Sequence, residues 1–419
     1  MVAAGAIVVA LAVTGCTPSQ SDPPPPDSRI DAAAGTSLHW ADGSVVRPTL
    51  VDLGDARAAN AGSDYEVVVQ TDPGNPRVDY LMPLALDPSG ALVTARVPAD
   101  QYTGGPALLK PTGMGSLDDG RQLTWDSTAA LVAGDRPRQV YAASTDQGVA
   151  AWAETASVRL DVSNWRIFTR GADGKVALLA RSEDVFDGDL PLVNGDTTPV
   201  VREGRVYWAT AAPADDSGSS FDMRVQSRGV DGSAPAVTEA EGASQPAPTA
   251  DGLFVVRSSH DDATVDDGTA TVERVTEPGR TQPFVTYSGP AGTTVQSLVG
   301  DDDRVAFVTS TEGDSGGVVY VLGTHDQTAV AIPLASSGRF TSLALCGDRL
   351  VWNSADGSGQ APFEPQYVMD LETRDVALVD VDHNYSGSYC SGDLVGWRAL
   401  SDDPQALATT TITRWKRPR

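Results

Sequence analysis

Residues 341–381 read TSLALCGDRLVWNSADGSGQAPFEPQYVMDLETRDVALVDV, a stretch in which short apolar runs alternate with turn residues. The runs predict four strands in succession, at Thr341–Leu345, Asp348–Asn353, Tyr367–Leu371 and Val376–Val381. Runs of five or six residues that are rich in β-branched and aromatic side chains are typical of strands. The stretch therefore predicts a sheet of four antiparallel strands joined in chain order.

The second strand of this stretch begins with a pattern that recurs along the chain. A Gly or Asp at a turn is followed by an apolar run, and an aromatic residue stands four positions after the turn residue. The clear copies are Gly148–Trp152, Gly204–Trp208, Asp303–Phe307, Asp348–Trp352 and Asp393–Trp397. The weaker copies, which lack the aromatic residue, are Gly90–Thr94 and Gly252–Val256.

The spacing of these copies predicts the architecture. Neighbouring copies are about 50 residues apart, and a period of this size with strand-like local patterns is typical of propeller blades. Third and fourth strands are predicted in two more blades, at Trp165–Arg170 with Lys175–Ala180 and at Val318–Leu322 with Ala329–Ile332. No long stretch of the sequence shows the apolar periodicity of a helix. We expect an all-β fold, a β-propeller of seven four-stranded blades, with six or eight blades as the alternatives.

The last copy of the pattern is one strand short of a full blade. It supplies strands near Ser388–Cys390, at Leu394–Leu400 and at Thr409–Trp415. We expect the N-terminal segment Ser44–Val51 to pair there as the fourth strand, because closing the ring removes an open sheet edge. The alternative is that this segment forms part of an N-terminal cap.

The N-terminus has the features of an export signal. Val2–Thr14 is an apolar run of about 13 residues, which is too short to span a bilayer. It leads into Val13-Thr14-Gly15-Cys16, which resembles a bacterial lipobox, a cleavage site in front of a cysteine that receives diacylglycerol. The resemblance implies lipidation of Cys16. Ordinary secretion with Cys16 as an incidental thiol is the alternative.

A polar, Pro-rich stretch follows Cys16 and cannot bury itself, so it predicts a semi-rigid spacer. We expect a lipoprotein signal peptide over residues 1–15, a membrane tether over 16–35 and the propeller over 36–419. The protein is then expected at the extracytoplasmic face of the cell membrane, held by lipid on Cys16.

The composition excludes one class of partner. The chain has 419 residues with 30 Lys and Arg against 56 Asp and Glu, which gives a formal net charge of −26. Affinity for nucleic acid depends on cationic side chains that release counterions, so this chain is not expected to bind it. Apolar residues make up 41% of the chain, enough for a packed core.

Two further cysteines support the exported location. Cys346 and Cys390 lie just before the turn residues Asp348 and Asp393, so they take nearly equivalent places on the inner strands of adjacent blades. We expect a disulfide between them, which would stabilise the fold by about 4 kcal/mol in the chain-entropy model. Two buried free thiols are the alternative.

Motifs that would carry catalysis are weak. Gly313-Asp314-Ser315-Gly316-Gly317 matches the nucleophile string of chymotrypsin-like proteases, but that chemistry needs a histidine base held by an aspartate. None of the four histidines has that family's context, and the string falls between two strands of one blade. We interpret it as a loop.

Carboxylates are frequent in the loops that join second and third strands, which all emerge on one face of a propeller. They include Asp215, Asp216, Asp261, Asp262, Asp266, Asp267, Glu312, Asp314, Asp356, Glu364, Asp402 and Asp403. Clustered carboxylates are hard-cation ligands, so calcium is the one cofactor considered, at Asp261, Asp262, Asp266 and Asp267. The alternative is that these loops are simply solvated.

A small ligand is expected at the channel mouth, near the starts of the inner strands. The polar candidates there are Arg138, Asp196, Gln245, Arg339, His383 and Tyr385. The strand tryptophans are not expected to form a sugar-stacking array, because their regular position places them in the core between blades: Trp152, Trp208, Trp352 and Trp397.

The lipobox, the Pro-rich spacer and the Trp-containing blades together resemble the TolB-like and WD-repeat-like propeller lipoproteins of actinobacteria. The resemblance implies extracytoplasmic scaffolding or ligand binding and transfers no catalytic residue. We expect a monomeric, non-enzymatic, membrane-tethered propeller that binds a protein or glycan of the cell envelope. The alternative is a propeller enzyme, a lyase or glycoside hydrolase that uses carboxylates at the channel mouth.

Overall fold

Strands make up almost all regular structure in the described part of the chain. The computed structural model describes residues 36–70, 80–87, 92–97, 113–118, 122–126, 138–157, 162–188, 190–191, 197–215, 218, 220–258, 268–311, 317–334, 342–353, 365–379, 384–399 and 409–416. Helical structure within these residues is limited to single 3-10 turns at Leu53–Asp55 and Ser182–Asp184. No helix in this part of the chain is long and apolar enough to cross a membrane.

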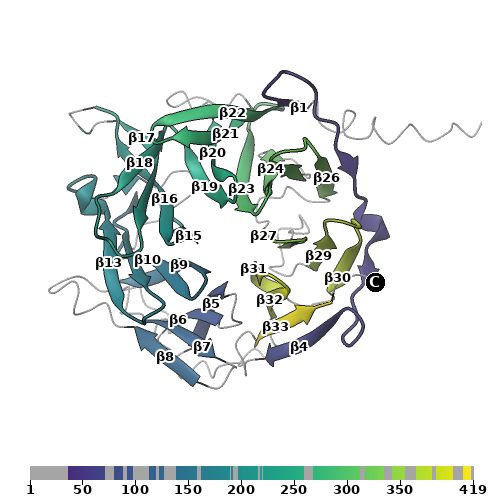
Figure 1. Ribbon diagram of the computed structural model, residues 1–419, viewed down its shortest axis with the longest axis horizontal. Coiled ribbons are helices and arrows are strands. Elements are labelled where there is room, and N and C mark those ends of the chain that lie inside the picture. Colours follow the sequence, from purple (N-terminus) through teal and green to yellow (C-terminus); the bar gives the residue numbers. More distant parts are fainter. Residues whose placement is uncertain are drawn as a thin grey trace, which may run out of the picture.

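Seven four-stranded sheets stand around one axis as the blades of a propeller, which confirms the predicted fold (Figure 1). Neighbouring inner strands contact each other around the whole ring. From the inside outwards, blade 1 is β5 (Tyr80–Leu86), β6 (Leu92–Val97), β7 (Gly113–Asp118) and β8 (Gln122–Asp126); blade 2 is β9 (Gln139–Asp146), β10 (Val149–Thr155), β12 (Arg166–Arg170) and β13 (Val176–Arg181); blade 3 is β15 (Val200–Arg202), β16 (Arg205–Pro213), β17 (Phe221–Gly229) and β18 (Val237–Glu241).

The remaining blades follow the same order. Blade 4 is β19 (Ser244–Thr249), β20 (Gly252–Ser258), β21 (Thr269–Glu277) and β22 (Arg280–Ser288); blade 5 is β23 (Thr293–Asp301), β24 (Arg304–Thr311), β25 (Gly317–Gly323) and β26 (Ala329–Leu334); blade 6 is β27 (Ser342–Cys346), β28 (Arg349–Asn353), β29 (Gln366–Asp370) and β30 (Val376–Val379); blade 7 is β31 (Asn384–Ser391), β32 (Leu394–Ala399), β33 (Thr409–Trp415) and β4 (Tyr65–Gln70). The short strands β11 (Val162–Ser163) and β14 (Leu190–Pro191) pair beside them. The strands predicted within 341–381 are β27 to β30, with ends that differ by one or two residues.

The N-terminal segment 36–70, here called the belt, runs along the outside of the ring (Figure 1). Its strand β1 (Ser37–Trp40) pairs antiparallel with β22 of blade 4. The two-residue strands β2 (Thr49–Leu50) and β3 (Arg57–Ala58) pair parallel with β26 and β30, at the outer edges of blades 5 and 6. The belt ends as β4, which pairs antiparallel with β33 and completes blade 7.

The ring is therefore closed by an N-terminal strand as predicted, but the predicted segment is wrong. Only Thr49 and Leu50 of Ser44–Val51 form a strand, and they lie on blade 5 rather than blade 7. Pro48 has no N–H group to donate to a sheet, which limits this segment to a short edge pairing. The closing strand is Tyr65–Gln70, where Val69 turns inward and is 7% exposed.

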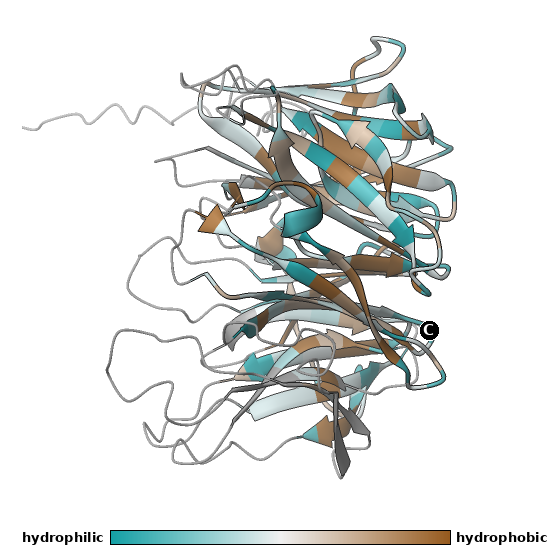
Figure 2. Cartoon of the chain, turned by 90° about the vertical axis from the view of Figure 1, so that its left-hand side faces the viewer, coloured by the Kyte–Doolittle hydropathy of each residue, from teal (hydrophilic) through white to brown (hydrophobic). Residues whose placement is uncertain are grey.

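The core lies between the blades. Buried apolar side chains of the described residues form seven clusters, and each joins two neighbouring blades. Both faces of a second strand are packed in this way, so all five residues of β28 are buried. The predicted inter-blade position of the tryptophans is confirmed at Trp152, Trp208, Trp352 and Trp397. Seen from the side, hydrophobic residues lie along the strands and hydrophilic ones gather in the turns (Figure 2).

The turn between an inner and a second strand explains the recurring Gly. In blade 2, Gln147 and Gly148 have φ angles of 49° and 79°, the backbone of a type I′ turn, whose twist suits a two-residue hairpin. Glycine takes such angles without a steric penalty. In blades 6 and 7 the positive φ angles, 56° and 58°, belong to Gly347 and Gly392, so they do not explain the Asp that follows each of them.

Candidate functional site

A cavity of about 570 Å³ lies on the axis of the ring and is lined by every inner strand. Polar and apolar surfaces contribute about equally to its wall, and Leu84, Val201, Ala247, Leu298 and Leu345 are among the apolar lining residues. The cavity reaches the end of the channel where the inner strands turn into the second strands. This end, here called the hairpin mouth, is formed by Asp146, Gln147, Arg202, Asp301, Cys346, Cys390 and Gly392.

The charged side chains of the hairpin mouth link the blades to one another. Nη1 of Arg202 in blade 3 donates to Oδ1 of Asp301 in blade 5 at 2.8 Å. The second oxygen of Asp301 accepts the backbone N–H of Gly347 in blade 6 at 2.5 Å. Oδ2 of Asp146 in blade 2 accepts the backbone N–H of Glu203 in blade 3 at 2.8 Å. These carboxylates therefore act as acceptors that fix the ring.

Two further ties complete the pattern. Oδ2 of Asp87 in blade 1 accepts from Oγ1 of Thr145 at 2.7 Å and from the N–H of Gly148 at 3.1 Å, both in blade 2. The predicted disulfide is confirmed: Cys346 of blade 6 is bonded to Cys390 of blade 7, with Cα atoms 5.9 Å apart. The inner ends of the blades are thus held together by covalent, ionic and hydrogen bonds.

Among the predicted ligand-binding residues, the side chains of Arg138 and Gln245 are described. Each forms hydrogen bonds with backbone groups of the same chain. Arg138 is buried in front of β9, and its Nη1 donates to the carbonyl oxygen of Asn164 at 2.7 Å. Gln245 lies in β19; its Nε2 donates to the carbonyl oxygen of Val295, and its Oε1 accepts the N–H of Leu298, each at 2.9 Å. They stand on blades 2 and 4, and each is held by its own hydrogen bonds within the protein.

The other predicted site residues are not tested by the described part of the chain. Tyr385 belongs to β31, but its side chain lies outside the description. The residues that lie wholly outside the described ranges are Cys16, Asp196, Arg339, His383, Asp261, Asp262, Asp266 and Asp267. Among the described residues no group of His, Cys, Asp and Glu is arranged to hold a metal ion.

A cluster of polar side chains lies in blade 2, near Arg138. Nη2 of Arg166 donates to Oε1 of Glu183 at 2.8 Å, and Nε1 of Trp152 donates to Oε1 of the buried Glu154 at 3.1 Å. Burial raises the pKa of Glu183, but the hydrogen bond and charge of Arg166, together with the charge of Arg138, outweigh it and lower that pKa. The cluster neutralises charge inside the blade.

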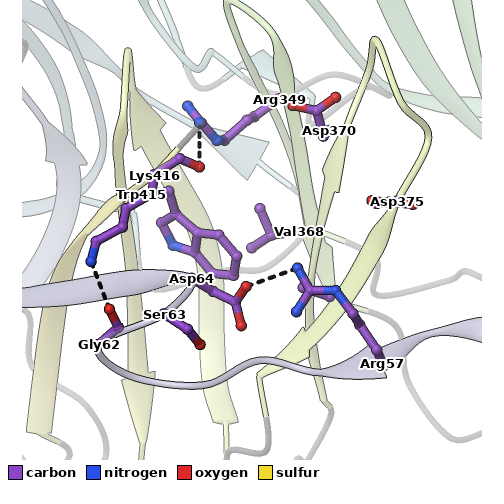
Figure 3. A pocket seen from close by; sticks show the side chains of 11 residues that line it. Arg57, Gly62, Ser63, Asp64, Arg349, Val368, Asp370, Asp375, Trp415 and Lys416 are labelled. Carbon is purple, nitrogen blue, oxygen red and sulfur yellow. Dashed lines mark hydrogen bonds and ion pairs between the residues drawn. The ribbon is translucent and has the colours of Figure 1, made fainter. Parts of the chain in front are cut away.

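A second cavity of about 570 Å³ opens where the belt crosses the junction of blades 6 and 7 (Figure 3). This cavity, here called the belt pocket, is lined by three segments of chain that lie far apart in sequence. Its lining consists of Arg57, Gly62, Ser63 and Asp64 from the belt, Arg349, Val368, Asp370, Asp375 and Ala377 from blade 6, and Trp415 and Lys416 from the end of blade 7.

Ion pairs and hydrogen bonds order the walls of the belt pocket. Nη2 of Arg57 lies 2.9 Å from Oδ1 of Asp64, and this hydrogen bond lowers the pKa of Asp64. Nζ of Lys416 donates to the carbonyl oxygen of Gly62 at 2.6 Å (Figure 3). Nη2 of the buried Arg349 donates to the carbonyl oxygen of Lys416 at 3.4 Å. The Lys416–Gly62 bond fastens the belt to the end of blade 7, the Arg57–Asp64 pair links two parts of the belt, and the Arg349 bond joins blade 6 to blade 7.

Neither the Arg202–Asp301 pair nor the belt pocket was predicted from the sequence. The pair could have been found by aligning the repeats, because both residues immediately precede the turn between an inner and a second strand. The belt pocket carries no comparable signal, since its three segments meet only after the ring has closed.

No family model and no curated protein sequence matches this chain. Solved structures with a similar fold include a Mycobacterium tuberculosis puromycin-hydrolyzing peptidase, 17% identical, with a TM-score of 0.48, covering 86% of this chain and 56% of its own. An oligogalacturonate lyase in complex with manganese is 10% identical, with a TM-score of 0.45 and coverages of 86% and 99%. The α-L-arabinofuranosidase Arb93A of Fusarium graminearum is 10% identical, with a TM-score of 0.40 and coverages of 84% and 97%.

This chain thus spans just over half the length of the peptidase. At these identities the similarity concerns the propeller fold, and it assigns no role to any residue of this chain.

Proposed function

We propose that this chain is a lipid-anchored, extracytoplasmic β-propeller that binds a protein of the cell envelope at its hairpin mouth and catalyses no reaction. The export signal and Cys16 support the anchor, and the Cys346–Cys390 disulfide is the kind of bond that persists in an oxidising compartment. A glycan is the alternative occupant of the mouth.

The observation that carries the binding role is how the mouth uses its carboxylates. A glycoside hydrolase or lyase needs paired acids, one of which stays protonated while the other is charged. At the hairpin mouth, which is the end of the channel opposite the starts of the inner strands, Asp146 and Asp301 instead each accept a backbone N–H of a neighbouring blade. These hydrogen bonds make the rim of the hairpin mouth rigid. A rigid rim that carries charged and apolar groups suits the binding of a partner protein.

Fatty-acid labelling tests the anchor. Cells that express the wild-type chain are grown with an alkyne-tagged fatty acid beside cells that express Cys16→Ala or the control Ser19→Ala. We expect label on the wild type and on Ser19→Ala and none on Cys16→Ala. An unlabelled wild-type chain would refute the lipid anchor.

Site-specific photo-crosslinking tests the binding site. A benzophenone amino acid is placed at Gln147, which is exposed and lines the cavity, or at Ser233, which is exposed in a turn of blade 3 away from it. We expect one envelope protein to be crosslinked from position 147 and not from 233. No adduct, or the same adducts from both positions, contradicts binding at the mouth. Repeating the experiment with a calcium chelator tests whether the partner needs calcium.

A further inference from the structure

The belt pocket has the size and composition of a small-molecule site. Its volume of about 570 Å³ falls within the range of ligand pockets, and it lies at a junction of separate structural units, where such pockets are common. Its lining residues come from the belt and from the second, third and fourth strands and outer turns of blades 6 and 7 and not from the inner strands, so it lies away from the channel axis. Binding there would be independent of the hairpin mouth.

The charges of the lining argue against an anionic ligand. Three cations, Arg57, Arg349 and Lys416, stand against three carboxylates, Asp64, Asp370 and Asp375. Two of the cations are paired with further carboxylates next to the pocket: Arg349 with Asp348 at 3.1 Å and Lys416 with Glu66 at 3.2 Å. The site therefore offers no excess of positive charge, and the net charge of −26 on the chain adds to the repulsion of anions.

The distribution of donors and acceptors fits hydroxyl groups. Guanidinium and ammonium groups can only donate, whereas carboxylates can only accept, and both kinds face the same small space. A hydroxyl group donates and accepts at once, so a ligand with several adjacent hydroxyls matches such mixed walls. Each bond to a charged side chain is stronger than a bond between neutral groups.

An apolar patch completes the lining. Val368, Ala377 and Trp415 contribute to it, and each is at most 6% exposed, so the apolar surface offered to a ligand is small. The ring of Trp415 lies in the middle of the pocket view (Figure 3). The polar walls therefore dominate the pocket, and they suit the hydroxyl groups of a ligand. We propose that the belt pocket binds a short neutral saccharide.

A ligand bound in this pocket would also stabilise the closed ring. The ligand would touch the belt, blade 6 and blade 7 together, next to the strand pair β4 and β33 that closes the propeller. A ligand that binds only the closed ring stabilises that ring by mass action. Saccharide binding is therefore expected to raise the melting temperature of the full chain.

Saturation-transfer NMR and thermal melting of the full chain test the proposal. The probes are the neutral sugars glucose, galactose, mannose, arabinose and trehalose, with galacturonate and glucose 6-phosphate as charged counterparts. We expect saturation transfer and a higher melting temperature with at least one neutral sugar, and weaker effects with the charged ones. The absence of both effects for every neutral sugar would overturn the proposal, and so would a preference for a charged sugar.

Matched variants locate the binding site. Asp375 and Glu372 are exposed carboxylates of the same turn, but only Asp375 lines the pocket. We expect Asp375→Asn to weaken binding about tenfold and Glu372→Gln to leave it unchanged. Ser63→Trp should fill the pocket and abolish binding, whereas Ser233→Trp should not. Equal affinities across all four variants would place the sugar elsewhere and overturn the assignment.

Discussion

Arg202 of blade 3 forms an ion pair with Asp301 of blade 5 across the hairpin mouth, at 2.8 Å, and so passes over blade 4. Asp301 also accepts the N–H of Gly347 in blade 6, so a single carboxylate joins three blades. Both side chains of the pair are less than one-quarter exposed, which limits the screening of their attraction by water.

Removing this pair should loosen the ring. We expect Arg202→Ala and Asp301→Asn each to lower the free energy of unfolding by about 1 to 3 kcal/mol, because each leaves a half-buried partner without its bond. Urea unfolding followed by tryptophan fluorescence measures the change. Arg280→Ala breaks the exposed Arg280–Glu277 pair and serves as the control, with an expected loss below about 0.5 kcal/mol. Equal losses in the control and the two variants would contradict the role given to the pair.

Breaking the disulfide should cost more. We expect Cys346→Ser with Cys390→Ser to lower the free energy of unfolding by about 4 kcal/mol, since the bond closes a loop with a sequence separation of 44 residues. Chemical unfolding of the wild type with and without dithiothreitol should show the same difference. An unchanged midpoint in the double variant would mean that the bond does not constrain the unfolded chain as argued.

Closure by β4 is tested by two valines on opposite faces of one strand. Val69 is 7% exposed and packs with Leu86 and Ile412, whereas Val67 is 53% exposed. Val69→Asp should bury an unpaired charge, destabilise the protein by more than about 3 kcal/mol and increase hydrogen exchange in β33. Val67→Asp should leave both unchanged. If the two variants behaved alike, β4 would not be the strand that closes the ring.

The part of the belt between β3 and β4 should be less stable in acid. The hydrogen bond from Arg57 holds the pKa of Asp64 below its ordinary value of 3.8, so the charged form is favoured in the folded protein. That stability is fully present above the unfolded pKa and is lost as the pH falls through the lower folded pKa.

Urea unfolding between about pH 5 and pH 2 measures this dependence. We expect Arg57→Ala to lose less stability over that interval than the wild type, because its Asp64 titrates nearer the ordinary value. Arg47→Ala, another exposed cation of the belt, should follow the wild type. Identical acid dependence in wild type and Arg57→Ala would show that the pair does not stabilise this part of the belt.

Much of the architecture could be predicted because each blade repeats the same local pattern. The strands β27 to β30, the tryptophans between the blades and the Cys346–Cys390 bond all follow from it. A second strand packed on both faces must be apolar along its whole length, and residues at equivalent places on neighbouring inner strands must lie close together. Such requirements are local, so they leave a mark in the order of the residues.

Contacts between distant segments left no such mark. The belt pairs with blades 4 to 7 through backbone hydrogen bonds, which nearly any residue can make, so only Pro48 in Ser44–Val51 indicated that another segment closes the ring. Local sequence therefore determined the blades, their core and the disulfide. Only the closed ring decided that Arg202 meets Asp301 and that Asp64, Asp375 and Lys416 line one pocket, because only ring geometry brings side chains so far apart in the chain to one place.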